Sequence, residues 1–158
     1  VHCKPYLTQD PSLQFNWSHT ASHALFAMGH AGEPLGVDVE TIKIRPFHGI
    51  AQQAFSTEER HHLHQLPAQL LPFGFFAFWS QKEAFIKALG VGLRYPLTRL
   101  TMPSISPAQL KHAYPFTDPL TRQSWQSQIF FPAPGVLAAV CARPSVHTWN
   151  YHVYDPTT

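Results

Sequence analysis

Hydrophobic and polar residues alternate over the first quarter of the chain, in short runs separated by glycine or proline. Runs with this period of two residues lie at 13–18, 24–29 and 35–40, and such alternation is typical of strands with one buried face. The pattern therefore predicts that three strands come first.

The period lengthens to that of a helix from residue 50 onward. A short helix is expected over 50–55, and the S-x-x-E sequence of 56–59 has the form of a capping box opening a second helix, which ends at Pro67. The longest apolar-periodic stretch covers 73–89 and is followed by Gly90, where a left-handed C-cap is favoured. We expect this stretch to be the main helix.

Four further strands are predicted after the main helix, at 97–102, 125–131, 136–143 and 147–154. Strands that are grouped in this way, and do not alternate with helices, indicate an α+β fold in which an antiparallel sheet packs against a long helix. A chain of 158 residues without internal repeats is expected to form one domain, covering 1–158.

The composition argues against several classes of protein. Charged residues make up 13% of the chain, against about 25% in an average protein, and the formal net charge is only +2. No block of like charges is available to bind nucleic acid, and no apolar stretch is long enough to span a bilayer. Cys3 and Cys141 lack the spacing of a zinc site, and the N-terminus lacks the layout of a secretory signal. We expect a cytoplasmic protein that binds neither nucleic acid nor membranes.

Two acidic residues stand two positions apart in the third predicted strand, which reads Gly-Val-Asp-Val-Glu over 36–40. Side chains two apart share a face of a strand, so Asp38 and Glu40 lie on one face and the two valines on the other. Taken alone, this spacing favours an ordinary solvated strand face, since surface carboxylates are common.

A second set of charges lies in the predicted main helix, which is otherwise rich in Phe and Trp. Glu83 and Lys87 are one turn apart and share a face. An isolated pair of this kind is a surface ion pair, but charges on a largely buried helix need partners. The neighbouring aromatic residues, Trp79 among them, are interpreted as core packing.

Together the two segments make a chemically coherent site. Asp38, Glu40 and Glu83 would offer three carboxylate ligands to Mg²⁺, which is normally held by a few carboxylates together with substrate phosphates. Lys82 and Lys87 would then face those phosphates. The residues alone therefore predict a site for a metal ion and a diphosphate.

The same segments resemble the paired signature of the 4'-phosphopantetheinyl transferase superfamily. Gly-Val-Asp-Val-Glu at 36–40 is followed by Trp-Ser-Gln-Lys-Glu-Ala-Phe-Ile-Lys at 79–87. Three shorter motifs resemble the family in the same order: Lys-Pro-Tyr at 4–6, Phe-Asn-Trp-Ser-His-Thr at 15–20 and Phe-Ser-Thr-Glu-Glu at 55–59. The chain looks like the second half of the larger, two-halved surfactin-synthetase-activating (Sfp) type, and we expect the first half to be absent.

The resemblance implies an enzyme that moves the 4'-phosphopantetheine group of coenzyme A onto a serine of an apo acyl or peptidyl carrier protein. Adenosine 3',5'-bisphosphate would be released. The resemblance also implies that Asp38, Glu40 and Glu83 hold Mg²⁺ against the diphosphate of coenzyme A, and that Glu83 takes a proton from the attacking serine. Lys87 would neutralise charge on the transferring phosphoryl group.

Further residues are implied to contact coenzyme A. By resemblance, Ser18 and His19 would contact its phosphates, while Lys4 and Pro5 would lie near its adenine end. Lys82 would face either solvent or the region of the 3'-phosphate, because its helical position is about 100° away from that of Glu83.

Two other hypotheses remain open at this point. The same carboxylates would also serve a Mg²⁺-dependent phosphohydrolase that acts on another diphosphate. Alternatively, the chain is a non-catalytic half that binds a carrier protein, or that pairs with a missing first half or a pseudo-symmetric second chain. The sequence does not show whether the carrier serves fatty acid, polyketide or nonribosomal peptide synthesis.

Overall fold

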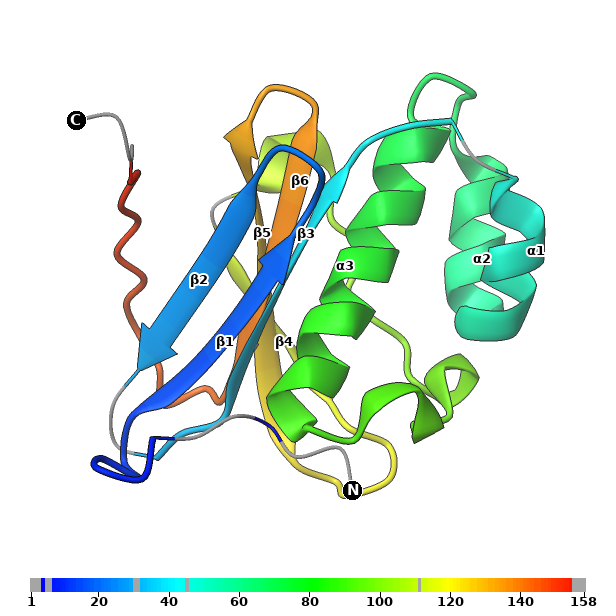
Figure 1. Ribbon diagram of the computed structural model, residues 1–158. Helices are drawn as coiled ribbons and strands as arrows, with labels where there is room; N and C mark the ends of the chain where they lie inside the picture. Colours follow the sequence, from blue (N-terminus) through cyan, green and yellow to red (C-terminus); the bar gives the residue numbers. More distant parts are fainter. Residues whose placement is uncertain (1–3, 5–6, 30–31, 45, 111, 155–158) are drawn as a thin grey trace.

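Two antiparallel sheets and three helices make up the computed structural model, which describes residues 4, 7–29, 32–44, 46–110 and 112–154 (Figure 1). A two-stranded sheet is formed by β1 (Gln14–His19) and β2 (Ala24–Gly29). A four-stranded sheet, in the order β3-β6-β5-β4, is formed by β3 (Leu35–Thr41), β4 (Ala113–Thr117), β5 (Ser124–Ala133) and β6 (Val136–Ala142). The helices are α1 (Phe47–Ala54), α2 (Thr57–Gln65) and α3 (Leu71–Leu89).

The elements are arranged in layers (Figure 1). Helix α3 covers one face of the four-stranded sheet, and α1 and α2 pack on the side of α3 that is remote from the sheet. The β1–β2 hairpin lies on the other side of the sheet, where both of its strands contact β3. Mixed helices and antiparallel sheets confirm the expected α+β class.

Strand β3 is buried on both faces because α3 and the hairpin cover it. A Cβ atom at Gly36 would lie 2.1 Å from the carbonyl oxygen of Ala84, so this face of β3 touches the backbone of α3. On the opposite face, Val39 packs with Val136 and Ala138, and Leu25 of β2 packs against them. The alternation predicts one buried face for this strand. In the structure both faces are buried, one toward the helix and one toward the hairpin.

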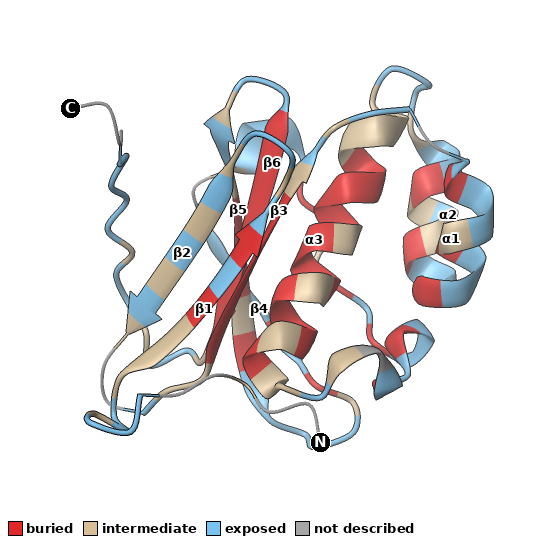
Figure 2. Cartoon of the chain, in the orientation of Figure 1, coloured by how far each residue is buried: buried red, intermediate tan, exposed pale blue. Residues whose placement is uncertain are grey.

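Helix α3 is the centre of the core and matches the predicted main helix. Pro72 lies in its first turn, and Gly90 ends it with a φ of 70°, its amide donating to the carbonyl of Ile86. Most of the helix surface is buried (Figure 2), including Phe85, whose ring makes edge contacts with Trp125 at 5.2 Å and Tyr95 at 5.3 Å. A helix buried on several sides is hydrophobic nearly all round, as its sequence is.

The two short helices begin differently, α2 with a capping box and α1 without a side-chain cap. At the start of α2 the Ser56 side chain accepts a hydrogen bond from the Glu59 amide, while the Glu59 carboxylate accepts one from the Ser56 amide, which confirms the predicted capping box. Helix α1 begins at Phe47, earlier than the predicted Ile50. The Phe47 ring packs on Phe75 of α3 at 4.7 Å, so tertiary contact extends the helix by three residues.

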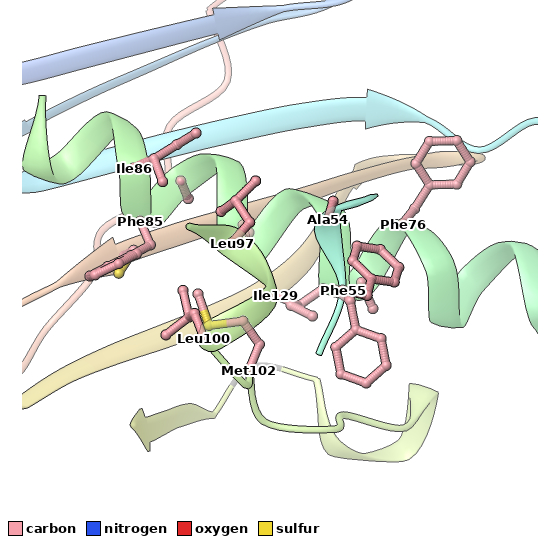
Figure 3. Packing of buried hydrophobic residues seen from close by; sticks show 14 of the residues in the cluster. Ala54, Phe55, Phe76, Phe85, Ile86, Leu97, Leu100, Met102 and Ile129 are labelled. Atoms are coloured by element: carbon pink, nitrogen blue, oxygen red, sulfur yellow. The ribbon is translucent and has the colours of Figure 1, made fainter. Parts of the chain in front are cut away.

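Two of the predicted strands are wrong. Residues 97–102 form a short 3₁₀ helix (Leu97–Arg99) and then irregular chain, since Pro96 and Pro103 flank the segment. Their side chains still reach the core, where Leu97, Leu100 and Met102 pack beside residues of α3 and β5 (Figure 3). Residues 147–154 form no regular structure. Two further 3₁₀ helices are Gly92–Arg94 and Pro107–Gln109.

One strand, β4, was not predicted because Pro115 lies within it. Proline cannot donate to a sheet ladder and is confined to edge strands, and β4 is at the edge of the four-stranded sheet. Within the part of the chain that is described, no helix is long and apolar enough to cross a bilayer.

Candidate active site at the β1–β3–α3 junction

Asp38 is the centre of a polar cluster that three elements share. The residue is 4% exposed, and its Oδ1 atom accepts hydrogen bonds from Lys87 Nζ of α3 at 2.7 Å and from Ser18 Oγ of β1 at 3.0 Å. Lys87 Nζ also lies 2.9 Å from Ser18 Oγ, which closes a triangle of the three groups. Residues that are 20 to 69 positions apart in the sequence therefore meet at one carboxylate oxygen.

The hairpin holds β3 through side chains of β1. The amide of Val37 donates to Asn16 Oδ1 at 2.9 Å, and the amide of Val39 donates to Ser18 Oγ at 3.3 Å. These two amides lie on the edge of β3 that is not paired with β6, where backbone donors need partners when buried. The side chains of β1 that accept hydrogen bonds from these amides therefore also fix the position of Ser18 beside Asp38.

Glu83 of α3 lies half-buried within electrostatic reach of this cluster. The pKa of Glu83 is raised to about 7, mainly by burial and further by the negative charges of Asp38 and Glu40, while Lys87 opposes the rise. Trp79, Glu83 and Lys87 are each four residues apart, so they follow one stripe of the helix. The carboxylate of Glu83 therefore lies within electrostatic reach of the two carboxylates of β3.

Glu40 is held by an aromatic residue. Trp79 Nε1 donates a hydrogen bond to Glu40 Oε1 at 3.0 Å. Sequence analysis interpreted Trp79 as core packing only, and the signal that could have found this contact is its place one turn before Glu83 on the same stripe.

A cavity of about 460 Å³ opens beside the cluster. Its walls include Trp17, Ser18 and His19 from β1, Asp38 and Glu40 from β3, and Lys87 from α3. Two larger cavities, of about 820 and 720 Å³, lie elsewhere on the molecule, and neither is lined by a carboxylate. The two carboxylates of β3, Lys87 and two of the residues implied to contact phosphates thus border one common space, whereas Glu83 is not among the residues that line it.

Lys82 is not at this site, and its predicted contact with coenzyme A is wrong. The side chain is fully buried, forming an ion pair with Glu59 Oε2 at 2.8 Å. Its ammonium group also donates to the carbonyl oxygens of Ala54, Leu97 and Leu100 at 2.7 to 2.9 Å. All its donors are occupied inside the core, so it has none to offer a phosphate.

Lys4 stands near the start of β3, with Nζ donating to the carbonyl of Leu35 at 2.7 Å and to Gln14 Oε1 at 3.3 Å. Partial burial lowers the pKa of this lysine. Pro5, the other residue implied to lie near the adenine end of coenzyme A, is outside the described residues. His19 is exposed at the rim of the cavity, where its ring stacks on Trp17 at 5.4 Å.

The fit of this cluster to a divalent cation rests on the donor atoms. Asp38 Oδ2 is buried without a hydrogen-bond partner among the described residues, and the pKa of Glu83 is raised partly by carboxylates that a cation would neutralise. As they stand, the described residues hold no group of three His, Cys, Asp or Glu side chains arranged for a metal ion, so the expected three-carboxylate cage is not preformed. The carboxylate oxygens present, with Asp38 Oδ2 unpartnered, are of the type that Mg²⁺ prefers.

Sequence comparison assigns the chain to a family. The profile of the 4'-phosphopantetheinyl transferase superfamily matches residues 34–141. The chain belongs to this superfamily. The superfamily match includes β3, all three helices and most of the four-stranded sheet, and therefore contains Asp38, Glu40, Glu83 and Lys87.

Individual members of the superfamily are similar over longer or shorter stretches. The chain is 41% identical over 98 residues to the 4'-phosphopantetheinyl transferase psf-1 of Bacillus pumilus, a match covering 62% of this chain and 41% of the relative. It is 30% identical over 141 residues to the 4'-phosphopantetheinyl transferase Sfp of Bacillus subtilis (strain 168), covering 88% of this chain and 59% of that protein. The L-aminoadipate-semialdehyde dehydrogenase-phosphopantetheinyl transferase of Homo sapiens is 31% identical over 121 residues, covering 68% of this chain and 38% of the human protein. The chain thus spans about half the length of the relatives it matches.

Proposed function

We propose that the chain transfers the 4'-phosphopantetheine group of coenzyme A onto a serine hydroxyl of an apo acyl or peptidyl carrier protein. The observation that carries this proposal is the meeting of Asp38, Lys87 and Ser18 beside a cavity that Glu40 and His19 also line. Membership of the superfamily and the names of the matched relatives support it.

The reaction forms one bond and breaks one. The serine oxygen attacks the phosphorus that carries the pantetheine arm, and the bond from that phosphorus to the oxygen of adenosine 3',5'-bisphosphate breaks. The serine gives up its proton, and the leaving bisphosphate takes the electron pair of the broken bond. In phosphoryl transfer a protein acts mainly by positioning groups and by stabilising charge.

The residues of the cluster suit these tasks. Lys87 is partly exposed at the cavity, so its ammonium can neutralise charge on the transferring phosphoryl group while Asp38 holds it in place. Glu83, half-buried one turn away, accepts the proton of the serine. Asp38, Glu40 and Glu83 would hold Mg²⁺, which, when bound, neutralises and polarises the diphosphate.

Coenzyme A is proposed to enter along β1. Ser18 and His19 border the cavity and would donate to its phosphates, and Lys4 with Pro5 would lie toward its adenine end. Since the chain spans about half of its relatives, a further polypeptide segment or a second chain is proposed to complete the coenzyme pocket. The reaction is proposed to take place in the cytoplasm.

The direct test incubates the chain with coenzyme A, Mg²⁺ and an apo-carrier protein, and follows the mass of the carrier. We expect the carrier to gain one phosphopantetheine group, and Asp38→Asn or Glu83→Gln to reduce the rate by about 100-fold or more. Glu58→Gln is the matched control, because Glu58 is an exposed carboxylate of α2 outside the cluster and should leave the rate unchanged.

Each alternative gives a distinct result in the same assay. Cleavage of coenzyme A without any carrier would indicate a phosphohydrolase. Carrier binding without transfer would indicate a non-catalytic half. Transfer at an unchanged rate by Asp38→Asn or Glu83→Gln would show that the cluster is not the active site.

A further inference from the structure

Trp79 is placed where it can control the direction of the Glu40 side chain. Its indole N–H donates to Glu40 Oε1 at 3.0 Å, across the interface between α3 and β3. Glutamate has three rotatable side-chain bonds, so a partly exposed glutamate at a cavity wall samples several directions unless a donor holds one of its oxygens.

The indole is itself held by the aromatic core. Its ring is stacked on Phe75 with a centroid distance of 6.3 Å and an interplanar angle of 9°. Phe75 is 1% exposed, and its ring contacts Phe47 of α1 at 4.7 Å and Phe55 at 5.2 Å. The donor therefore packs against the buried aromatic core, and a close-packed neighbour transmits its position to the group that it binds.

The donor's chemistry suits a ligand that must keep its charge. An indole N–H donates one hydrogen bond and carries no charge, so it fixes Glu40 without neutralising it. Asp38 is held differently, by the cationic ammonium of Lys87. Of the two carboxylates of β3, Glu40 is thus held by a neutral donor from the aromatic core.

From this geometry we propose that Trp79 is a positioning residue for cation binding: it aims the Glu40 carboxylate at the divalent cation of the site. This inference rests on the proposed function, because it assumes that Glu40 is a ligand. Partners that orient metal ligands from behind typically change metal affinity or activity by about 10- to 100-fold when removed.

The test measures cation binding without any turnover. Mn²⁺ is titrated into the full chain and free Mn²⁺ is followed by electron paramagnetic resonance. Trp79→Phe, which keeps an aromatic ring but lacks the N–H, should weaken Mn²⁺ binding by about 10-fold or more. The matched control is Trp125→Phe, because the Trp125 Nε1 atom is buried without a hydrogen-bond partner among the described residues. The same chemical change should therefore leave the Mn²⁺ affinity unaltered there.

A double-mutant cycle with Glu40→Gln shows whether Trp79 acts through Glu40. We expect Trp79→Phe to have no further effect on Mn²⁺ affinity in the Glu40→Gln background. In the transfer assay, Trp79→Phe should raise the Mg²⁺ concentration for half-maximal rate, and saturating Mg²⁺ should restore most of the rate. Should Trp79→Phe fail to fold, as judged by circular dichroism, Trp79→Met provides a flexible side chain without a donor.

The possible results distinguish a failure of this inference from a failure of the proposed function. If Glu40→Gln weakens Mn²⁺ binding and Trp79→Phe does not, the positioning role is overturned and the metal site stands. If Trp79→Phe is equally harmful with and without Glu40, Trp79 acts by another route and the inference is again overturned. If Glu40→Gln leaves Mn²⁺ affinity unchanged, Glu40 is not a ligand, and both the inference and the metal assignment fail.

Discussion

Gly36 sets the distance between β3 and α3, and with it the distance between Asp38 and Lys87. A Cβ atom at this position would lie 2.1 Å from the Ala84 oxygen and 2.4 Å from the Ala88 nitrogen, both of them backbone atoms of α3. Backbone atoms of a buried helix cannot move aside as a flexible side chain can. The glycine is therefore required by close approach.

We predict that Gly36→Ala lowers the free energy of unfolding by about 3 kcal/mol or more. Overpacking a core is most destabilising when the neighbouring atoms cannot move, so the loss should lie at the upper end of the range for such substitutions. Urea unfolding followed by circular dichroism measures this. Gly49→Ala in α1 is the control, because a Cβ there meets nothing within 4 Å, and alanine is favoured over glycine in a helix by about 0.5 to 1 kcal/mol. An equal loss of stability in both variants would contradict the close-approach argument.

At this scale the sequence predicted the residues of the site better than their contacts. Asp38, Glu83 and Lys87 could be found because the spacing on a strand and on a helix decides which side chains share a face. The stripe that Trp79 shares with Glu83 places the indole on the site face of the helix, but its hydrogen bond to Glu40 depends also on how β3 packs against α3. Lys82 was misplaced for the same reason, since its helical position alone does not reveal that Glu59 lies beside it.

Lys82 and Glu59 join elements of the helical layer. The ion pair links α3 to α2, and the further hydrogen bonds of Lys82 reach Ala54 at the end of α1 and the segment 97–100. Glu59 at the same time accepts from the amides of Ser56 and Met102. A single buried cation thus donates to three backbone carbonyls from two separate segments, of which that of Leu97 also accepts a hydrogen bond from the Leu100 amide.

Breaking this pair should be severely destabilising. We predict that Lys82→Met lowers the free energy of unfolding by about 3 to 5 kcal/mol, because Glu59 is left as an uncompensated buried charge. The double variant Lys82→Met with Glu59→Gln should be more stable than Lys82→Met alone, since glutamine carries no charge. Thermal or urea unfolding of the two variants checks this, and a double variant less stable than the single one would contradict the explanation.

The turn between β4 and β5 depends on Asp118. Burial by itself would raise the pKa of this carboxyl, but hydrogen bonds from Thr121 at 2.5 Å, from Tyr95 and from the amides of Leu120 and Thr121 outweigh burial and lower it. A carboxyl whose pKa is lower in the folded state than in the unfolded state contributes stability above its unfolded pKa. That contribution is lost as the pH falls through the folded pKa.

Acidification should therefore lower the free energy of unfolding, in part because Asp118 becomes protonated. Between about pH 6 and about pH 3, we expect the unfolding midpoint in urea to fall further for the natural chain than for Asp118→Asn, which has no proton to take up. An equal fall of the urea midpoint in the two proteins would show that Asp118 does not cause the loss of stability.

The elements themselves divide into those that local pattern determines and those that it does not. The hairpin, β3, α2 and α3 follow from alternation, the capping box and the Gly90 C-cap. The segment at 97–102 alternates like a strand, yet prolines flank it and the carbonyls of Leu97 and Leu100 accept hydrogen bonds from Lys82, a tertiary contact that the local pattern does not report. Strand β4 contains a proline and is stabilised by pairing with β5, which no local signal reports.

The whole molecule combines parts of unequal stability. Every residue of β6 is buried, whereas β2 alternates between exposed and partly buried residues, and Phe26 and Met28 are 56% and 60% exposed (Figure 2). A two-stranded sheet has little stability of its own. The hairpin is therefore expected to be the part of the fold that opens most easily, although it carries Ser18 of the proposed site.

Hydrogen exchange should reveal this difference. Followed by mass spectrometry, amides of β1 and β2 should exchange faster than those of β6 and α3, because local opening of the hairpin exposes little apolar surface. Coenzyme A with Mg²⁺ should slow exchange in β1 more than in β6, since ligands stabilise the conformations that bind them, and Ser18 and His19 are proposed to contact the phosphates. Equal protection of hairpin and sheet in the free chain would contradict the stability argument. Slowing confined to the four-stranded sheet would instead place coenzyme A away from β1, and the proposed entry of the substrate along that strand would have to be abandoned.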